Sequence, residues 1–413
     1  MASFLLIFNA LTANATSRSW CYLTDNPQAP ASQQLRLAER TLICEKESTL
    51  KNRSQSTTLY DKEQLAIVRG NIYEINNLPV TILHQSHGYS LVLKKDLSEL
   101  THDHHLNVIN IDDFKPLIKT NIKSPRSSQP HIQALVDQVN PNAWLADIVT
   151  LSSWSRRTGE AGNVSAANWI ENKFQQLNLA VSKPSFNVGQ TNTNNIMAIQ
   201  SGTTRPDDWY VVGGHMDSIA NNAPNAPGAV DNASGCAAVL EMARIASAYH
   251  FAGSIIFICY SGEEQGLYGS EFHANTLIAN NNDEKIKAAL TMDMVGYIHN
   301  SQHELLVESS ASYQWLMNSL VQNAATYAPN LSVITSTNYF GSDHVSYIDN
   351  DMPGVLSIDN DYSLYPNYHR STDLPENINL SQGESIIKTN LATLAELAEV
   401  LGVSDLIYRN GFD

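Results

Sequence analysis

The sequence places imidazole and carboxylate side chains directly after successive apolar runs. The runs 209–212, 254–260 and 288–292 are followed by His215 and Asp217, by Glu263 and Glu264, and by Asp293. Each run has the composition of a buried strand, and glycines lie beside the first two. Ligands of open α/β sheets bind outside the carboxyl ends of the strands. We therefore expect these side chains to lie in one site.

Two further residues extend this set. Asp231 falls at the start of a predicted helix, 16 residues after His215, and His369 lies in the loop that follows the apolar run 354–358. Two imidazoles and three carboxylates are too many for one four-coordinate zinc, but they suit two ions that share a bridging carboxylate. A nitrogen and oxygen donor set without thiolate favours zinc, or cobalt or manganese, over copper(I) or calcium.

Two acidic residues remain beside the predicted ligands. Asp217 lies two residues beyond His215, so that on an extended chain both side chains lean to one side. It is placed to accept the second ring N–H of His215. Glu263 precedes the predicted ligand Glu264, and a carboxylate beside a metal-bound water is suited to act as a general base. The alternative is that Glu263 is a solvent-facing acid with no role.

The periodicity of the chain after residue 130 predicts alternating helices and strands. Helices are expected at 131–139, 142–154, 163–177, 231–249, 268–281, 311–327 and 381–400. Strands are expected near 182–187, 194–200, 208–214, 254–260, 288–294, 304–308, 332–335 and 354–358. This alternation predicts an α/β fold with a mostly parallel mixed sheet of about eight strands and helices on both faces.

The N-terminal third of the sequence has a different pattern of apolar and polar residues. Met1–Ala15 is apolar and ends in Ala13-Asn14-Ala15, which predicts a signal peptide over 1–20, although a basic start is missing. Short alternating runs over 21–121 predict a small α+β domain, with a helix over Gln33–Cys44. The polar segment 122–130 predicts a linker to a catalytic domain over 131–413. The cluster His102–His105 is interpreted as a surface loop.

The net charge and the cysteines of the chain limit the kinds of partner and the disulfides that can be expected. The chain has 413 residues, with 25 Lys and Arg against 41 Asp and Glu, and its formal net charge is −16. That charge argues against nucleic acid or an anionic membrane as a partner. Four cysteines contain no C-x-x-C pair. Cys21 and Cys44 are able to pair in an exported precursor, whereas Cys236 and Cys259 are interpreted as small buried hydrophobic residues.

The motifs around these residues carry a family resemblance. The segments GGHMDS, GAVDNASG, SGEEQGLYGS, 292–296 and NYHRSTD closely resemble the zinc aminopeptidases of the M28 family. The nearest subgroup is the secreted bacterial leucyl aminopeptidases of the Vibrio type, and the resemblance covers about 131–402.

The resemblance implies a role for each residue. It implies that His215 and Asp293 hold one zinc, that Glu264 and His369 hold the other, and that Asp231 bridges the two. It also implies that Glu263 is the general base, that Asp217 supports a ligand, that Tyr339 polarises the substrate carbonyl, and that the peptide bond between Asp231 and Asn232 is cis.

Together these observations predict a secreted, monomeric di-zinc aminopeptidase that removes the first residue of peptides with a free N-terminus. Apolar first residues such as leucine are expected, in a pocket formed by Met294, Phe340, Leu364 and Tyr368. The N-terminal domain is expected to be a propeptide that covers the cleft. The alternatives are a glutaminyl cyclase, a carboxypeptidase or dipeptidase on the same fold, and a binding domain without catalysis.

Overall fold

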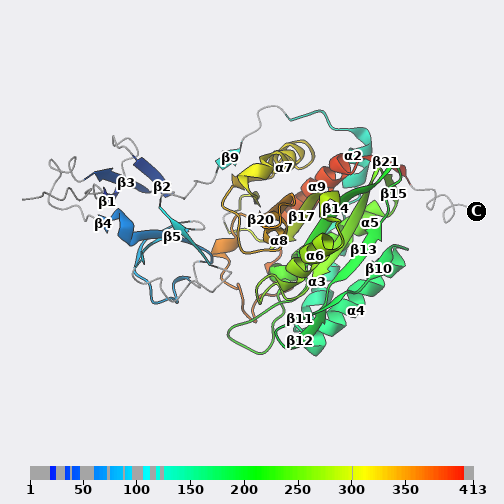
Figure 1. The fold of residues 1–413 in the computed structure, drawn as a ribbon, viewed down its shortest axis with the longest axis horizontal. Coiled ribbons are helices and arrows are strands. Elements are labelled where there is room, and N and C mark those ends of the chain that lie inside the picture. The colour runs from blue at the N-terminus through cyan, green and yellow to red at the C-terminus, as the bar shows by residue number, and fades with distance from the viewer. Residues whose placement is uncertain are drawn as a thin grey trace, which may run out of the picture.

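The computed structural model describes residues 19–24, 33–37, 40–46, 60–71, 75–86, 89–94, 106–111, 118–120, 125–299 and 301–403. An α/β domain forms the larger part of the molecule, and a β-rich N-terminal domain lies at one end of it (Figure 1). Residues 1–18 of the predicted signal peptide and the His102–His105 cluster lie outside the described residues.

A nine-stranded mixed sheet forms the centre of the α/β domain, in the order β10-β13-β16-β14-β17-β20-β18-β19-β9. Its central strands β16, β14, β17 and β20 are parallel, and β18 and β19 are parallel to each other. The strands are β9 (Ile118–Thr120), β10 (Ala180–Ser182), β13 (Ile196–Gln200), β14 (Arg205–His215), β16 (Gly253–Tyr260), β17 (Ile286–Asp293), β18 (Glu304–Glu308), β19 (Ser332–Ser336) and β20 (Gly354–Asp359).

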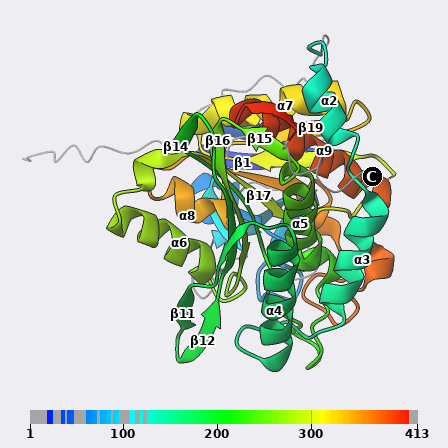
Figure 2. The same cartoon turned by 90° about the vertical axis from the view of Figure 1, so that its right-hand side faces the viewer.

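Helices cover both faces of this sheet, as Figure 2 shows. On one face lie α2 (Pro130–Val136), α3 (Pro141–Ser152), α4 (Ala161–Gln176), α5 (Ser234–Ala246), α7 (Gln314–Tyr327) and α9 (Leu380–Leu397). On the other lie α6 (Tyr268–Ala279) and α8 (His344–Ile348). Small pairs complete the domain: β11 (Ser185–Val188) with β12 (Thr191–Asn194), and β15 (Tyr249–Phe251) with β21 (Val400–Val403). The predicted α/β class is confirmed.

Strand β16 shows why both faces must be covered. Its residues alternate between two cores: Ile255, Phe257 and Cys259 pack on the α5 side, while Ile256, Ile258 and Tyr260 pack on the α6 side. A strand that is apolar on both faces is typical of a parallel sheet between two helix layers. None of the helices in the described ranges combines the length and the apolar character that crossing a membrane requires.

Close packing brings the start of α5 against the strand ends. A Cβ added to Gly235 would lie 2.3 Å from the carbonyl oxygen of Met292, so only glycine permits this approach. The predicted helix 231–249 was too long. The structure begins α5 at Ser234, because Asp231 takes extended torsion angles (φ −115°, ψ 96°), and Tyr249–Phe251 continues as β15 instead.

The N-terminal domain contains two four-stranded sheets, in the orders β2-β3-β1-β4 and β6-β7-β5-β8. Their strands are β1 (Ser19–Thr24), β2 (Gln33–Leu37), β3 (Arg40–Lys46), β4 (Tyr60–Asp61), β5 (Leu65–Arg69), β6 (Ile82–Ser86), β7 (Tyr89–Leu93) and β8 (Asn107–Asn110). The helix predicted over Gln33–Cys44 was wrong, because β2 and β3 pair with each other and β3 pairs with β1. Such non-local pairing overrides local propensity. A disulfide joins Cys21 to Cys44, a pairing that the sequence left open.

The segment before the predicted linker also reaches the larger domain. Strand β9 pairs with β19 and adds an antiparallel strand to the edge of the central sheet. The predicted N-terminal region 21–121 is therefore attached to the central sheet by main-chain hydrogen bonds as well as by the chain itself. The linker residues 125–129 that follow are exposed and belong to no helix or strand.

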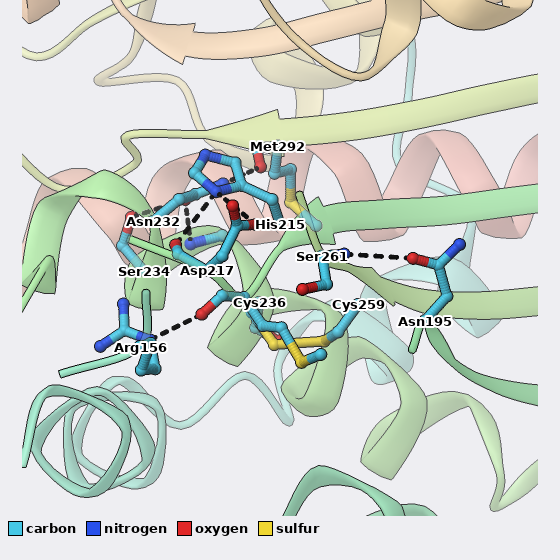
Figure 3. Close-up of a disulfide and its surroundings, with 12 residues drawn as sticks. Arg156, Asn195, His215, Asp217, Asn232, Ser234, Cys236, Cys259, Ser261 and Met292 are labelled. Carbon is cyan, nitrogen blue, oxygen red and sulfur yellow. Dashed lines mark hydrogen bonds and ion pairs between the residues drawn. A yellow bond between two sulfur atoms is a disulfide. The ribbon is translucent and has the colours of Figure 1, made fainter. Parts of the chain in front are cut away.

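The interpretation of Cys236 and Cys259 as separate buried hydrophobic residues was wrong. They form a disulfide between α5 and β16, with the two Cα atoms 5.6 Å apart, which is within the range that a disulfide spans. Figure 3 shows this bridge with His215, Asp217 and Asn232 drawn around it. It links the helix that follows Asp231 to the strand that precedes Glu263, so it fixes two parts of the candidate site relative to each other.

Replacing both cysteines of this bridge should destabilise the α/β domain. The bridge closes a loop with a sequence separation of 23, and the chain-entropy model gives about 3 kcal/mol for a loop of that length. Urea unfolding of the Cys236→Ala/Cys259→Ala variant, with the Cys21–Cys44 disulfide kept oxidised, should show that loss of unfolding free energy. The matched control is Cys21→Ala/Cys44→Ala, which lies in the other domain and should leave the unfolding of the α/β domain unchanged. A loss below about 0.5 kcal/mol would contradict the stabilising role.

Candidate active site

Six buried side chains converge at the carboxyl ends of the central strands. They are His215 at the end of β14, Asp231 before α5, Glu263 and Glu264 after β16, Asp293 at the end of β17 and His369 after β20. The Nε2 atom of His215 lies 3.3 Å from Asp231 Oδ1, 3.5 Å from Asp293 Oδ1 and 3.8 Å from Glu263 Oε2. The structure thus brings together these six residues, which the sequence predicts to share one site.

Asp231 lies between the two histidines. Its Oδ1 faces His215, while its Oδ2 lies 3.3 Å from the Nε2 atom of His369. His369 is also 3.1 Å from Glu264 Oε2. The Asp231 carboxylate thus directs Oδ1 toward the group that contains His215 and Asp293. It directs Oδ2 toward the group that contains His369 and Glu264.

The separations fit a metal centre. Ligand atoms on a tetrahedral zinc lie about 3.3 Å apart, since the bonds are about 2.0–2.1 Å long. The imidazole to carboxylate separations at Asp231, Glu264 and Asp293 run from 3.1 to 3.5 Å. Four buried carboxylates against two imidazoles also leave an excess of negative charge, which cations would balance. The donor set therefore fits metal ions.

Burial and the neighbouring side chains shift the pKa values of several acids in the cluster. Burial raises the pKa of Glu264 to about 7, and burial raises the pKa of Glu263 well above its ordinary value although His215 opposes it. Burial also acts to raise the pKa of Asp231, but hydrogen bonds from His215 and His369 lower it overall. Asp231 is thus the carboxylate that these surroundings keep ionised most strongly.

Asp217 positions the loop that carries the two glutamates. Its Oδ1 accepts a hydrogen bond from the Glu263 N–H at 3.3 Å, and its Oδ2 accepts one from the Glu264 N–H at 3.2 Å. The Nδ1 atom of His215 lies 3.2 Å from the backbone oxygen of Asp217 and 3.7 Å from its carboxylate. Asp217 therefore supports His215 through its main chain and the glutamates through its side chain.

Asp373 fixes Asp231, and the sequence analysis gave it no role. Its carboxylate accepts hydrogen bonds from the N–H groups of Val230 at 2.8 Å and of Asp231 at 3.0 Å. The Tyr365 hydroxyl donates to the same carboxylate at 2.6 Å. Its place in the NYHRSTD segment, four residues after His369, was the signal that could have found it.

Neighbours of Asp231 and Asp293 tie these two acids together. The Asn232 amide donates to the Met292 carbonyl at 3.0 Å and accepts from the Met294 N–H at 3.2 Å. The Ser342 hydroxyl donates to Asp293 Oδ2 at 2.8 Å. The peptide bond between Asp231 and Asn232 is cis, as the family resemblance implies.

Arg156 is a second residue that the sequence analysis missed. It is fully buried, and its guanidinium donates to the carbonyls of Met216 at 2.7 Å, Leu151 at 2.9 Å and Gly228 at 2.7 Å. Burial lowers its pKa to about 10, so it stays charged at neutral pH. It therefore holds the segments after His215 and before Asp231 together while adding a positive charge behind the acids. No local pattern distinguishes it in the sequence.

A cavity opens beside the cluster. It is lined by Asn71, Asp231, Glu263, Asp293, Met294, Glu308, Phe340, Gly341, Leu356, Ile358, Tyr362 and Tyr368. Three of the four predicted pocket residues, Met294, Phe340 and Tyr368, therefore lie where they were expected. Leu364 is half-buried in the turn Tyr362–Leu364 and does not line the cavity. Strand residues Leu356 and Ile358 take part instead.

Tyr339 is not part of this cavity lining. Its hydroxyl donates to Asp349 Oδ1 at 3.2 Å, and its ring lies edge-on to His344. In this arrangement the hydroxyl is engaged away from the acidic cluster. The predicted role of Tyr339 at the substrate carbonyl stays a prediction.

The N-terminal domain supplies one wall of the cavity. Asn71 is buried and donates to the carbonyls of Tyr362 at 3.2 Å and Tyr365 at 3.0 Å. The centres of water-sized molecules have about 30 Å³ of the cavity open to them, enough for roughly two such molecules. The position of Asn71 could not be read from the sequence, because its partners lie almost 300 residues away.

An α/β sheet with imidazoles and carboxylates gathered at the carboxyl ends of its strands is typical of metal-dependent hydrolases. Residues 194–394 match the family model described as Peptidase family M28, which confirms the predicted resemblance. A probable zinc metalloprotease of Pyrenophora teres is 32% identical over 211 residues, which are 46% of this chain and 44% of the relative. This chain thus spans about half the length of that curated relative.

Other similarities cover more of both chains. A probable leucine aminopeptidase of Arthroderma otae is 26% identical over 65% of this chain and 75% of the relative. The LapA aminopeptidase of Legionella pneumophila superimposes with a TM-score of 0.60 and 21% identity, covering 81% of this chain and 98% of that one. A glutaminyl cyclase of Macrostomum lignano gives a TM-score of 0.58 at 18% identity over 69% and 97%. Both structures show a shared fold.

Substituting Asp373 should weaken zinc binding. Asp373→Asn retains the size of the side chain but removes the charge that orients the Asp231 main chain, and loss of such an outer partner typically costs 10- to 100-fold in metal affinity. Chelator competition measures this affinity without any substrate. The matched control is Asp137→Asn, an exposed acid after α2. An affinity within about twofold of the unmodified protein would show that Asp373 has no such role.

Proposed function

We propose that this chain is an exported aminopeptidase that binds two zinc ions and removes the first residue of peptides. The observation that carries the proposal is the position of Asp231, whose two carboxylate oxygens face the imidazoles of His215 and His369 separately. In this proposal His215 and Asp293 would hold one ion, Glu264 and His369 the other, and Asp231 would bridge them.

When bound, zinc ions would lower the pKa of a water molecule and polarise the scissile carbonyl. The residues of the chain have separate tasks. Asp217, Asp373 and Arg156 would keep the ligands in place. Because the carboxylates of the cluster are buried beside the cavity, they would attract the protonated amine of a free peptide N-terminus more than an internal amide.

Glu263 is the proposed general base. Its carboxylate lines the cavity, and its Oε2 is further from His215 Nε2 than the nearest oxygens of Asp231 and Asp293. It therefore lies further from His215 than the two acids proposed as ligands beside that imidazole. It would take a proton from the attacking water and deliver it to the leaving amine.

The cavity walls support recognition of the first residue. Met294, Phe340 and Tyr368 together with Leu356 and Ile358 form a largely apolar surface. This surface would accept an aliphatic stem, which is the basis for the prediction of apolar first residues such as leucine.

The N-terminal domain is proposed to be an inhibitory propeptide. Asn71 lines the same cavity as Glu263 and Asp293 and donates to the Tyr362 and Tyr365 carbonyls, so the N-terminal domain would cover part of the proposed substrate site. The two disulfides, Cys21–Cys44 and Cys236–Cys259, are typical of exported proteins and support secretion. We propose a monomer with peptides as its only partners.

The fold is shared with a glutaminyl cyclase, so the site must decide between the two reactions. The cluster contains enough imidazole and carboxylate donors for two ions sharing Asp231, whereas a one-zinc site needs fewer. This favours the aminopeptidase. Carboxypeptidase activity would require a cationic group for the substrate carboxylate, and the residues that line the cavity include none.

Glu263→Gln should retain zinc while it lowers kcat by roughly 10²–10⁴-fold, the usual effect of removing a general base. The substitution keeps the size of the side chain but removes the proton acceptor. Turnover of leucyl p-nitroanilide, with zinc measured in the same samples, checks it. The control is Glu271→Gln on the exposed face of α6. Retained zinc with a loss of less than about tenfold would exclude Glu263 as the base.

Cutting the chain within 125–129 and removing the N-terminal fragment should raise kcat/KM, because the cavity would open. Strand β9 pairs with β19, so the fragment is expected to stay bound after the cut, and gel filtration must show when it has left. A sequence-specific protease site placed in this exposed segment allows a single cut. Equal kcat/KM before and after removal, at equal zinc content, would rule out inhibition.

A further inference from the structure

The cavity contains a carboxylate that the proposed mechanism does not use. Glu308 is the last residue of β18, its side chain is 2% exposed, and it lines the cavity together with Glu263 and Asp293. The remaining side chains of that wall, Met294, Leu356 and Ile358, are apolar. A single acid buried on an apolar wall calls for an explanation, because an isolated buried charge is costly.

Arg69 of the N-terminal domain balances this charge. It is the last residue of β5, it is 1% exposed, and its guanidinium forms an ion pair with Glu308. The guanidinium also donates to the Asn338 carbonyl and lies 4.5 Å from the centre of the Phe340 ring. A carboxylate, a carbonyl and an aromatic face together are the features that recognise a guanidinium group.

This recognition site belongs to the catalytic domain, while its occupant belongs to the N-terminal domain. Glu308, Asn338 and Phe340 remain in place when the N-terminal domain leaves, but Arg69 goes with it. Breaking a buried ion pair by removing one partner leaves an uncompensated charge. Burial raises the pKa of Glu308, while the Arg69 guanidinium and a hydrogen bond from Ser336 lower it, so a cation beside Glu308 favours its carboxylate form.

We propose that Glu308 selects peptides whose first residue carries a cationic side chain, arginine above all, and that Arg69 occupies the same position in the uncut chain. The proposal rests on the aminopeptidase function above, and it replaces the apolar first residue expected from the sequence with a cationic one. The apolar wall would contact the methylene groups of the arginine stem, Phe340 would lie against the guanidinium, and Glu308 would pair with it.

The competing interpretation is that Glu308 only anchors the N-terminal domain. In that case the opened pocket would favour leucine, as the apolar walls by themselves suggest. The two interpretations differ in what the protein does after the N-terminal domain has been removed, and this difference can be measured with substrates of matched shape.

The experiment uses zinc-loaded full-length protein, cut within 125–129 after folding and freed of the N-terminal fragment. It compares kcat/KM for the p-nitroanilides of arginine, citrulline and leucine. Citrulline has the length of arginine without its charge. We expect arginine to exceed citrulline on the order of 10- to 100-fold, the range for one hydrogen-bonded charge pair. In Glu308→Gln this ratio should fall to near one.

The matched control is Glu304→Gln at the other end of β18, where the carboxylate accepts from Asn360 and does not line the cavity. It should keep the arginine preference. Inhibition of leucyl p-nitroanilide turnover by free L-arginine, against L-leucine, needs no variant and so remains informative if Glu308→Gln does not fold.

The outcomes separate the two proposals. Turnover of leucine with no preference for arginine over citrulline, or an arginine preference that survives in Glu308→Gln, would overturn the role of Glu308 and leave the aminopeptidase function intact. No turnover of any of the three substrates by zinc-loaded protein would overturn the aminopeptidase function and this proposal with it.

Discussion

The structure depends on one electrostatic constraint: four carboxylates and two imidazoles are buried together at the ends of the central strands. Like charges held this close repel each other strongly in a medium of low dielectric constant. The surrounding residues are arranged to hold them despite this. Main-chain N–H groups near Asp231 are fixed by Asp373, those of Glu263 and Glu264 are fixed by Asp217, and Arg156 adds a buried positive charge. The disulfide between α5 and β16 joins the two segments that carry most of the acids. Metal ions would complete the balance of charge.

Much of the site could be predicted from the sequence because its residues follow strands. The ends of buried strands are visible as apolar runs, and in a parallel sheet those ends lie side by side, which is why the sequence could predict that His215, Glu264 and Asp293 lie close together. Contacts between distant segments were not visible. The disulfide between Cys236 and Cys259, the hydrogen bonds of Arg156 and the strand pairing over Gln33–Cys44 all depend on tertiary neighbours. Tyr339 and Leu364 lie in loops whose exact path no periodicity predicts.

Contacts between the N-terminal domain and the α/β domain determine the shape of the cavity. Asn71 and Arg69 lie at the end of β5, and both reach main-chain or side-chain groups around the cavity. The same two residues thus connect a folded N-terminal domain to the wall of the candidate active site. Their partners include the loop with Asn338 and Phe340, so the N-terminal domain contacts a segment adjacent to Tyr339. The shape of the cavity in the uncut chain is therefore a property of both domains.

The central claim is that Asp231 is shared between two metal ions. Anomalous X-ray diffraction from zinc-loaded crystals, recorded on both sides of the zinc absorption edge, tests it most directly. The account predicts two zinc peaks about 3.5–4 Å apart. Both should lie within about 2.0–2.2 Å of an Asp231 oxygen, one beside His215 and Asp293 and the other beside Glu264 and His369. A single peak in crystals grown with excess zinc, or two peaks that do not share Asp231, would contradict it.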